Sequence, residues 1–276
     1  MYLTFAKHKI EDAQQLPFKA EEYCRFKFGD KAFAKTFGEE LANDFIKIHA
    51  NTLLDAQELV VVPSPYNAIP TASGLMTVFF KEIINQFLYQ NNRPFLLESK
   101  IHRYNTYSVD YSQLSYYERL KLMASDTYHF HESFLNNKTC LFLDDIRVTG
   151  SHEQIIKNML EVNKLSGAFI FVYFAAFNNR NIPPNLESYL NTFAIKSLGD
   201  VCQVINSPSF SPTTRIIKYI LNSEPNLLLS YLDKIDLTML KEIVRLALQN
   251  NYHHMPEYRD NFYAIARFTK GTPFTN

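Results

Sequence analysis

The sequence lacks several features that would place it in common classes of protein. No uninterrupted apolar run approaches the roughly 18 residues that a membrane-spanning helix needs, so we expect no membrane partner. Lysine plus arginine equals aspartate plus glutamate, at 28 each, which leaves a formal net charge of zero. A chain without a basic excess has no broad electrostatic surface for nucleic acid, so we expect no nucleic-acid partner.

Cysteines are few, and an N-terminal export signal is missing. Cys24, Cys140 and Cys202 are odd in number and scattered, which favours buried thiols in a reducing compartment over a disulfide framework. The apolar run of residues 1–5 is too short for a signal peptide, and charged residues follow it. We therefore expect a cytoplasmic protein. Internal repeats and low-complexity tracts are also absent.

What is present suits a globular α/β protein. With 276 residues, 46% of them hydrophobic, the chain can form one large domain or one domain with an appendage. Short apolar runs alternate with segments of helical periodicity, a pattern typical of a parallel sheet that binds ligands at the carboxyl ends of its strands. The predicted strands are residues 59–62, 94–97, 140–143 and 168–177.

The two ends of the chain are predicted to be helical. We expect an α/β domain over residues 1–200, with an N-terminal helical extension to about residue 58, and a helical C-terminal subdomain over 201–276. Asp30 and Asp236 are each placed to cap a helix. Residues 26–30 (FKFGD) either belong to the core, which we favour, or border the active site.

Residues 139–152 carry the strongest functional pattern. A buried strand leads to Asp144 and Asp145, then to the small residues Thr149, Gly150 and Ser151, and then to a helix. A loop that opens a helix presents unpaired N–H groups and attracts a phosphate, while adjacent carboxylates suit a sugar diol or Mg²⁺. Ser151 and Gln154 also fit a capping box, which is compatible with phosphate binding.

The run from Leu143 to Ser151 resembles the phosphoribosyl pyrophosphate (PRPP) motif of type I phosphoribosyltransferases. Arg103, followed by residues 113–115 and 118–119 and then by Phe130, resembles the ComF-like branch of that superfamily. The PRPP motif, residues 63–67 (PSPYN) and the helical tail together make the chain similar to a phosphoribosyltransferase-like family encoded near bacterial tellurium-resistance and stress genes. The resemblance implies a Rossmann-like parallel core with a helical cap.

The resemblance also implies roles for individual residues. Asp144 and Asp145 would hold the ribose hydroxyls and, indirectly, Mg²⁺; the 5′-phosphate would lie on Val148, Thr149, Gly150, Ser151 and His152; Ser64, Tyr66 and Asn67 would receive the pyrophosphate; and Lys100 and Arg103 would balance the leaving group. The loop at residues 63–67 departs from the family pattern, because it lacks the usual basic residue and paired glycines.

The implied reaction is the Mg²⁺-dependent displacement of pyrophosphate from PRPP by a nitrogen nucleophile of a small-molecule acceptor. Purine-salvage members carry an acidic residue where this chain has Val148, so a purine handled in that way is not expected. A regulatory protein that binds PRPP or a nucleotide without catalysis is the second interpretation, and a scaffold with a vestigial site is the third. A homodimer is one possible assembly.

Overall fold

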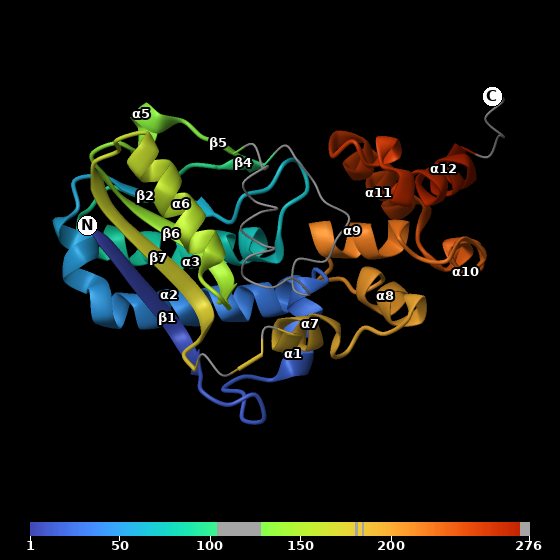
Figure 1. Cartoon of the computed structure of the whole chain (residues 1–276), viewed down its shortest axis with the longest axis horizontal. Helices are drawn as coiled ribbons and strands as arrows, with labels where there is room; N and C mark the ends of the chain where they lie inside the picture. The colour runs from blue at the N-terminus through green and yellow to red at the C-terminus, as the bar shows by residue number, and fades with distance from the viewer. Residues whose placement is uncertain (104–127, 180–181, 184, 271–276) are drawn as a thin grey trace.

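The computed structural model describes residues 1–103, 128–179, 182–183 and 185–270 (Figure 1). Its centre is a five-stranded parallel sheet with the strand order β1-β7-β6-β2-β3, which confirms the predicted parallel α/β architecture. The strands of this sheet are β1 (Tyr2–Ile10), β2 (Leu59–Pro63), β3 (Leu97–Glu98), β6 (Lys138–Arg147) and β7 (Gly167–Phe177). A separate antiparallel pair consists of β4 (His102–Arg103) and β5 (Tyr128–His129).

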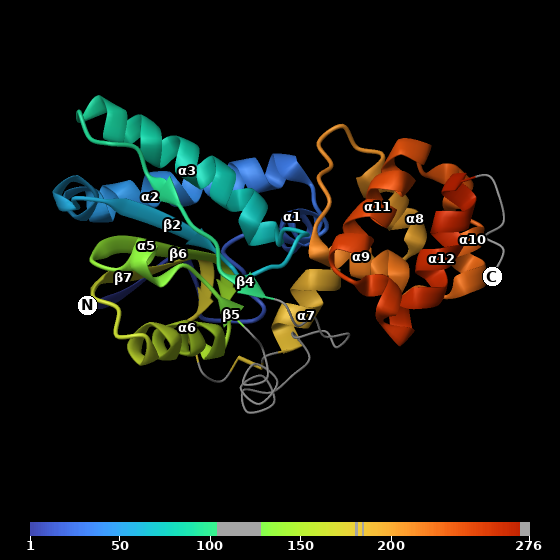
Figure 2. The same cartoon turned by 90° about the horizontal axis from the view of Figure 1, so that it is seen from above.

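Helices cover both faces of the sheet, as Figure 2 shows. The helices of this part are α1 (Ala20–Lys27), α2 (Lys31–Asp55), α3 (Ala72–Gln90), α5 (Glu132–Leu135), α6 (Ser151–Val162) and α7 (Asn185–Thr192). Helices α2 and α3 lie together on one face, and α6 lies on the other. Successive side chains of β2 point to opposite faces of the sheet. Val61 belongs to the core under α2 and α3, whereas Val60 and Val62 belong to the core under α6. Burial on both faces explains the continuous apolar run.

The N-terminal segment is where the prediction was wrong. Residues 2–10 do not form a helical extension; they form β1, an edge strand that pairs in parallel with β7. Only Phe5 and Ile10 of this strand are buried, and the Lys7 ammonium pairs with Asp44 of α2 at 2.7 Å. Because a half-exposed edge strand has weak apolar alternation, its pairing depends on β7, which lies far away in the sequence. The predicted cap of α2 is confirmed, since Asp30 accepts a hydrogen bond from the Ala32 N–H.

A histidine of β1 should make the fold sensitive to acid. The His8 ring packs against Phe174 and Phe18, with ring centroids 4.8 and 5.7 Å apart. Burial lowers the pKa of His8 from 6.5 to about 4; neighbouring Lys7 lowers it too, and Asp44 opposes them. Below pH 6.5, His8 is therefore protonated in the unfolded chain but stays neutral in the folded protein, so the free energy of unfolding falls as the pH drops towards 4. We expect His8 to contribute on the order of 1–3 kcal/mol to this loss.

Urea unfolding at about pH 5 and pH 7 measures this contribution. The variant His8→Gln should lose less stability than the wild type between the two pH values, because its side chain does not titrate. The matched control His254→Gln, at an exposed position, should follow the wild type. An equal loss in His8→Gln and the wild type would contradict the assignment.

The C-terminal helices enclose a second hydrophobic core. They are α8 (Leu198–Ile205), α9 (Thr214–Leu221), α10 (Pro225–Leu229), α11 (Leu237–Gln249) and α12 (Pro256–Lys270), with the 3₁₀ turns η2 (Leu232–Lys234) and η3 (Tyr252–His254). Cys24, Phe28 and Ile69 from the N-terminal half join this core. Asp236 caps α11 as predicted, and Thr213 caps α9. The domain boundary predicted at residue 200 falls inside α8, and the division into domains stays a prediction.

The three cysteines are buried free thiols, as the sequence predicts. None of the helices in the described part of the chain combines the length and hydropathy needed to cross a bilayer.

Candidate functional site

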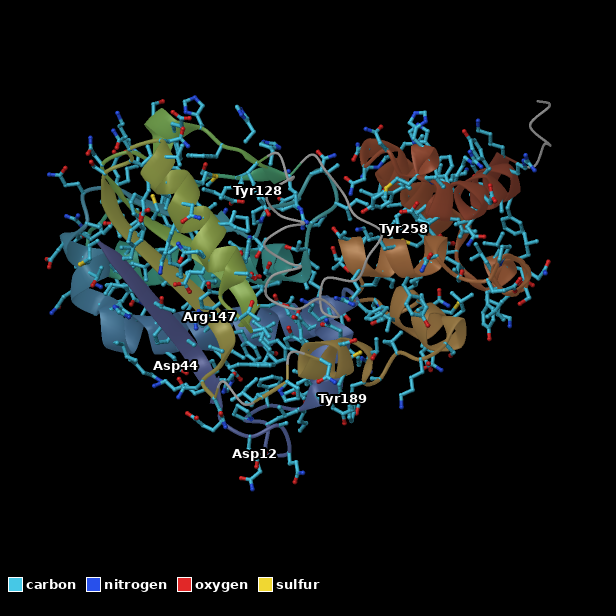
Figure 3. All side chains as sticks on the ribbon, viewed as in Figure 1. Asp12, Asp44, Tyr128, Arg147, Tyr189 and Tyr258 are labelled. Atoms are coloured by element: carbon cyan, nitrogen blue, oxygen red, sulfur yellow. The ribbon has the colours of Figure 1, made fainter. Side chains whose placement is uncertain are left out.

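A cavity of about 770 Å³ opens at the carboxyl ends of β2 and β6, between the sheet and the C-terminal helices. In Figure 3, Tyr128 and Arg147 lie on the sheet side and Tyr258 on the helical side; all three line the cavity. The predicted site residues that line it are Ser64, Tyr66, Asn67, Arg103, Asp144, Asp145, Val148, Thr149, Gly150, Ser151 and His152. The structure therefore brings together eleven of the twelve predicted residues, and Lys100 alone stays outside the cavity lining.

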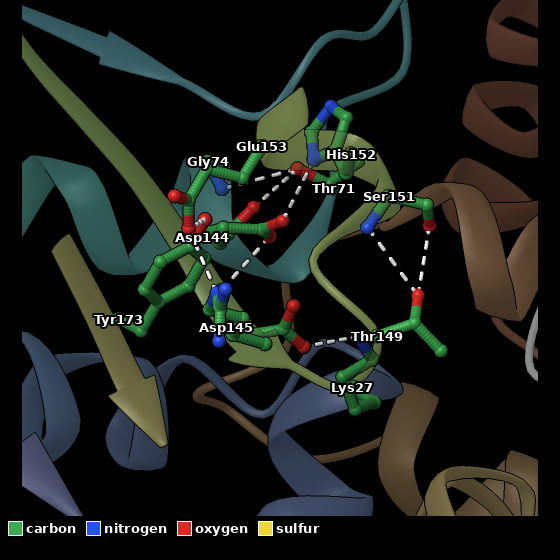
Figure 4. Close-up of polar contacts among 12 residues, drawn as sticks. Lys27, Thr71, Gly74, Asp144, Asp145, Thr149, Ser151, His152, Glu153 and Tyr173 are labelled. Atoms are coloured by element: carbon green, nitrogen blue, oxygen red, sulfur yellow. Dashed lines mark hydrogen bonds and ion pairs between the residues drawn. The ribbon is translucent and has the colours of Figure 1, made fainter. Parts of the chain in front are cut away.

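The two carboxylates of the motif have different surroundings. Strand β6 does not end at residue 143 as predicted but continues to Arg147, so consecutive side chains point to opposite faces. The Asp144 Oδ2 lies 3.1 Å from Nδ1 of His152, and its Oδ1 accepts a hydrogen bond from the Asp145 N–H at 2.8 Å (Figure 4). Burial alone would raise the pKa of Asp144, but the hydrogen bond and charge of His152 outweigh it and lower that pKa. Asp144 is therefore ionised at neutral pH.

Asp145 is buried, with 6% of its surface exposed, and belongs to a triad. Its Oδ2 accepts a hydrogen bond from the Tyr23 hydroxyl at 2.8 Å. The same carboxylate forms an ion pair with the Lys27 ammonium (Figure 4). Burial raises the pKa of Asp145 and the Asp144 charge adds to this, while the Lys27 ammonium opposes it. Lys27 lines the cavity, which agrees with the less favoured interpretation of residues 26–30, that they border the site. The only indication of this in the sequence was a single lysine between two phenylalanines, Phe26 and Phe28.

Gly150 shapes the loop that follows β6. Its φ of +76° lies in the left-handed region, and α6 begins directly after it at Ser151. The capping box predicted for Ser151 and Gln154 does not form, because Gly150 occupies the cap position. Instead the Thr149 and Ser151 hydroxyls share a hydrogen bond of 2.9 Å, and the Ser151 N–H donates to Thr149 Oγ1 at 3.3 Å. Thr149, Gly150 and Ser151 all line the cavity where α6 begins.

Replacing Gly150 with alanine should strain this loop. The new Cβ would meet the Arg147 guanidinium at 2.9 Å in a backbone conformation that side chains disfavour. We expect a loss of about 1–2 kcal/mol in the free energy of unfolding, measured by urea denaturation, and weaker binding of phosphate ligands. The control Gly74→Ala lies in helix α3, where a Cβ meets only ordinary contacts, and should be neutral or stabilising. Equal effects at both glycines would contradict the role given to Gly150.

Glu153 holds α6 against the sheet, a contact that sequence reasoning missed. Its carboxylate, in a residue 4% exposed, accepts hydrogen bonds from Arg147 Nε at 2.8 Å, Lys157 Nζ at 2.6 Å and the Tyr173 hydroxyl at 3.2 Å. Burial would raise the pKa of Glu153, but Lys157 and Arg147 outweigh burial and lower it. The network directs the Arg147 guanidinium to Glu153.

The loop after β2 is held by the rest of the protein. Lys100 donates a hydrogen bond to the Asn67 carbonyl, and its ammonium lies 3.8 Å from the centroid of the Tyr66 ring. Burial lowers the pKa of Lys100. Lys100 thus binds the loop after β2 and is not among the residues that line the cavity. The Ser64 hydroxyl, in a residue 8% exposed, lines the cavity close to Asp144, and it helps to lower the pKa of that carboxyl.

The C-terminal helices supply the opposite wall of the cavity, with residues that are not among the predicted site residues. Arg215, Lys218 and Tyr219 of α9 line the cavity, as does Asn250 just after α11. The apolar stripe of α9 (Ile216, Ile217, Ile220 and Leu221) is buried and leaves its polar side towards the cavity. Periodicity alone indicates such a polar side, but not what it faces.

The residues of the cavity fit a substrate-borne magnesium ion better than a protein-bound one. Within the described ranges, no group of three or more histidine, cysteine, aspartate or glutamate side chains is placed to hold a metal. Mg²⁺ commonly binds to one or two carboxylates together with substrate phosphates. Asp144, ionised and facing the cavity, suits that mode.

A parallel sheet with an acidic strand end, a glycine loop and a helix start around one cleft is the architecture of type I phosphoribosyltransferases. The model of the PRTase ComF-like family matches residues 1–265, and the chain belongs to that family. This assignment confirms the predicted superfamily, branch and fold class. The closer likeness to proteins of tellurium-resistance gene clusters stays a prediction.

Comparison with solved structures finds more distant similarities. One is an HPRT alanine mutant made to analyse an invariant aspartic acid, with 13% identity, a TM-score of 0.35 and coverage of 55% of this chain and 80% of that chain. Another is a hypoxanthine phosphoribosyltransferase from Staphylococcus aureus, with 12% identity, a TM-score of 0.31 and coverage of 60% and 80%. A search of curated proteins finds no match. The family assignment rests on the sequence match alone.

Proposed function

We propose that this protein is a phosphoribosyltransferase that displaces pyrophosphate from PRPP in a Mg²⁺-dependent reaction. The observation that carries the proposal is the common cavity, which joins the acidic end of β6, the loop that opens α6 and the loop after β2. These three features supply a carboxylate, backbone amides and neutral donors at one place, as a ligand with a sugar, a phosphate and a pyrophosphate requires. The acceptor is a small molecule with a nucleophilic nitrogen.

The 5′-phosphate is proposed to bind where α6 begins. Backbone N–H groups and the helix dipole favour an anion there, and Gly150 allows the phosphate to approach the backbone closely. The Thr149 and Ser151 hydroxyls and the Val148 and His152 positions complete this part of the site. The ribose hydroxyls then fall next to Asp144, whose orientation the His152 ring fixes.

In the proposed reaction, the acceptor nitrogen forms a bond to the anomeric carbon while the bond from that carbon to pyrophosphate oxygen breaks. The bonding electrons leave with the pyrophosphate, and the nitrogen releases its proton to solvent. Positive charge develops on the sugar in the transition state, so the fixed negative charge of Asp144 stabilises it. Asp145 acts through position, because it ties β6 to Lys27 and Tyr23. Bound Mg²⁺ would neutralise the pyrophosphate and so improve it as a leaving group.

A second function, PRPP or nucleotide binding for regulation without catalysis, is favoured by one observation. Residues 63–67 carry no basic side chain, and nearby Lys100 is engaged with Tyr66 and Asn67. A weak grip on the leaving group would allow binding while slowing turnover.

Two measurements separate these functions. Calorimetry with PRPP and Mg²⁺ tests binding, and a pyrophosphate-release assay over a panel of nitrogen-containing acceptors tests turnover. The enzyme is expected to bind PRPP and to release pyrophosphate with at least one acceptor. Binding without release across the panel would support the regulatory function, and no binding of PRPP or ribose 5-phosphate would refute both.

A further inference from the structure

The loop after β2, which would receive the pyrophosphate, carries no cation of its own. The loop after β2, residues 63–70, contains neither lysine nor arginine, and the ammonium of Lys100 is held by Tyr66 and Asn67. A pyrophosphate group carries several negative charges, and charge-assisted hydrogen bonds from arginine or lysine are the strong means of binding them. Arg103, whose backbone N–H donates to the Tyr66 carbonyl, lines the cavity beside this loop and is one such cation. Any further cation must come from another element if PRPP is the ligand.

Helix α9 begins against this loop. The Thr214 N–H donates to the Pro70 carbonyl at 2.9 Å, and its hydroxyl donates to the Ile69 carbonyl at 2.9 Å. On the same side, the Ala68 N–H donates to Oδ1 of Asn250 at 2.9 Å, and Asn250 is 4% exposed. The loop and the start of α9 are therefore held in one fixed arrangement.

Two basic residues of α9 follow at once. Arg215 is adjacent to Thr214 and Lys218 lies three residues further, so both share one side of the helix, and both line the cavity. The lining contributed by α9 to α12 includes a single described acidic residue, Glu224. Its carboxylate accepts from the N–H groups of Asn226 and Leu227 at the start of α10. This wall of the cavity is therefore positively charged.

We propose that α9 supplies the cationic half of the pyrophosphate site through Arg215 and Lys218, in place of the base that the loop after β2 lacks. The neutral half comes from the loop itself, where the buried Ser64 hydroxyl lines the same cavity. This inference rests on the proposed PRPP chemistry and deepens it. It makes the C-terminal helices a working part of the active site rather than an appendage.

Calorimetry with three probes tests the inference: PRPP with Mg²⁺, pyrophosphate with Mg²⁺, and ribose 5-phosphate, which has no pyrophosphate. The double variant Arg215→Gln with Lys218→Gln should bind the first two about 10-fold or more weakly. Its affinity for ribose 5-phosphate should stay within about twofold of wild type, because the contacts at the start of α6 are untouched. The charge-conserving pair Arg215→Lys with Lys218→Arg should retain most of the affinity for pyrophosphate.

A charge-matched control removes two cations elsewhere. Lys241→Gln with Arg267→Gln changes exposed residues of α11 and α12 outside the cavity lining and should bind all three probes like the wild type. Thermal melting of every variant shows whether it is folded, and the single variants replace the double one if it is not.

Each other outcome has a defined meaning. Unchanged pyrophosphate affinity in the Arg215 and Lys218 variants overturns the inference. An equal loss for ribose 5-phosphate also overturns it, because the cations would then hold the sugar phosphate. Intact PRPP binding with a raised acceptor KM assigns α9 to the acceptor and overturns it as well. A wild type that binds none of the probes refutes the proposed function itself, which is a separate result.

Discussion

Asp144→Asn should abolish most PRPP-dependent turnover while the protein stays folded. The carboxylate faces the cavity, and the hydrogen bond and charge of His152 keep its pKa low, so the wild type presents a full negative charge to the sugar. Asparagine keeps the size of the side chain but removes this charge when the transition state needs it. By analogy with the loss of other fixed electrostatic contacts, we expect kcat to fall about 100- to 1,000-fold.

The measurement is pyrophosphate release at saturating PRPP, with circular dichroism to verify folding. Asp233→Asn, at an exposed position outside the cavity lining, is the matched control and should keep the wild-type rate. A rate for Asp144→Asn within about threefold of the wild type would show that the carboxylate does not serve the reaction. In a regulatory protein without turnover, the same variant would instead weaken PRPP binding.

Asp145→Ala should mainly destabilise the fold. Removing the carboxylate leaves the Lys27 ammonium without its counterion in a site where the lysine side chain is 13% exposed, and it leaves the Tyr23 hydroxyl without its acceptor. Breaking a buried ion pair in this way typically costs about 3–5 kcal/mol. We therefore expect the urea midpoint to fall markedly, with the loss of free energy calculated from a two-state fit.

A double-mutant cycle shows whether the loss comes from the stranded charge. Asp145→Ala combined with Lys27→Met removes both charges, and this variant should regain a substantial part of the stability lost by Asp145→Ala alone. The control Glu242→Ala breaks the exposed ion pair with Arg245 and should leave the midpoint nearly unchanged. Additive losses in the cycle would mean that Lys27 and Asp145 do not stabilise each other.

The functional motif was readable because its signals are local. A buried strand, an acidic pair, a glycine and a helix follow one another within residues 139–152, and each depends on near neighbours. The length of the strand was not readable in the same way. Its continuation to Arg147 depends on pairing with β7. Because side chains alternate along this longer strand, Asp144 contacts His152 whereas Asp145 contacts Tyr23. The two adjacent acids of the motif therefore have different surroundings, His152 for Asp144 and Lys27 with Tyr23 for Asp145.

Residues distant in the sequence account for the remaining differences. Lys27 reaches Asp145 across 118 positions, and the Thr214 hydroxyl reaches Ile69 across 145. Lys100 was predicted to balance the leaving group but does not line the cavity, because the Tyr66 ring and the Asn67 carbonyl bind its ammonium. The residues predicted at 113–115 and 118–119 lie outside the described part of the chain.

The sequence by itself determined the class of fold through hydrophobic periodicity, the superfamily through the resemblance of residues 143–151 to the PRPP motif, and the loop that opens α6 through Gly150, because each of these signals lies within a short stretch of the chain. Only the tertiary structure decided that residues 2–10 join the sheet, that Lys27 neutralises Asp145, and that α9 forms the second wall of the cavity. These contacts join segments far apart in the chain. They form only when the sheet and the second hydrophobic core bring those segments together, so no local pattern encodes them.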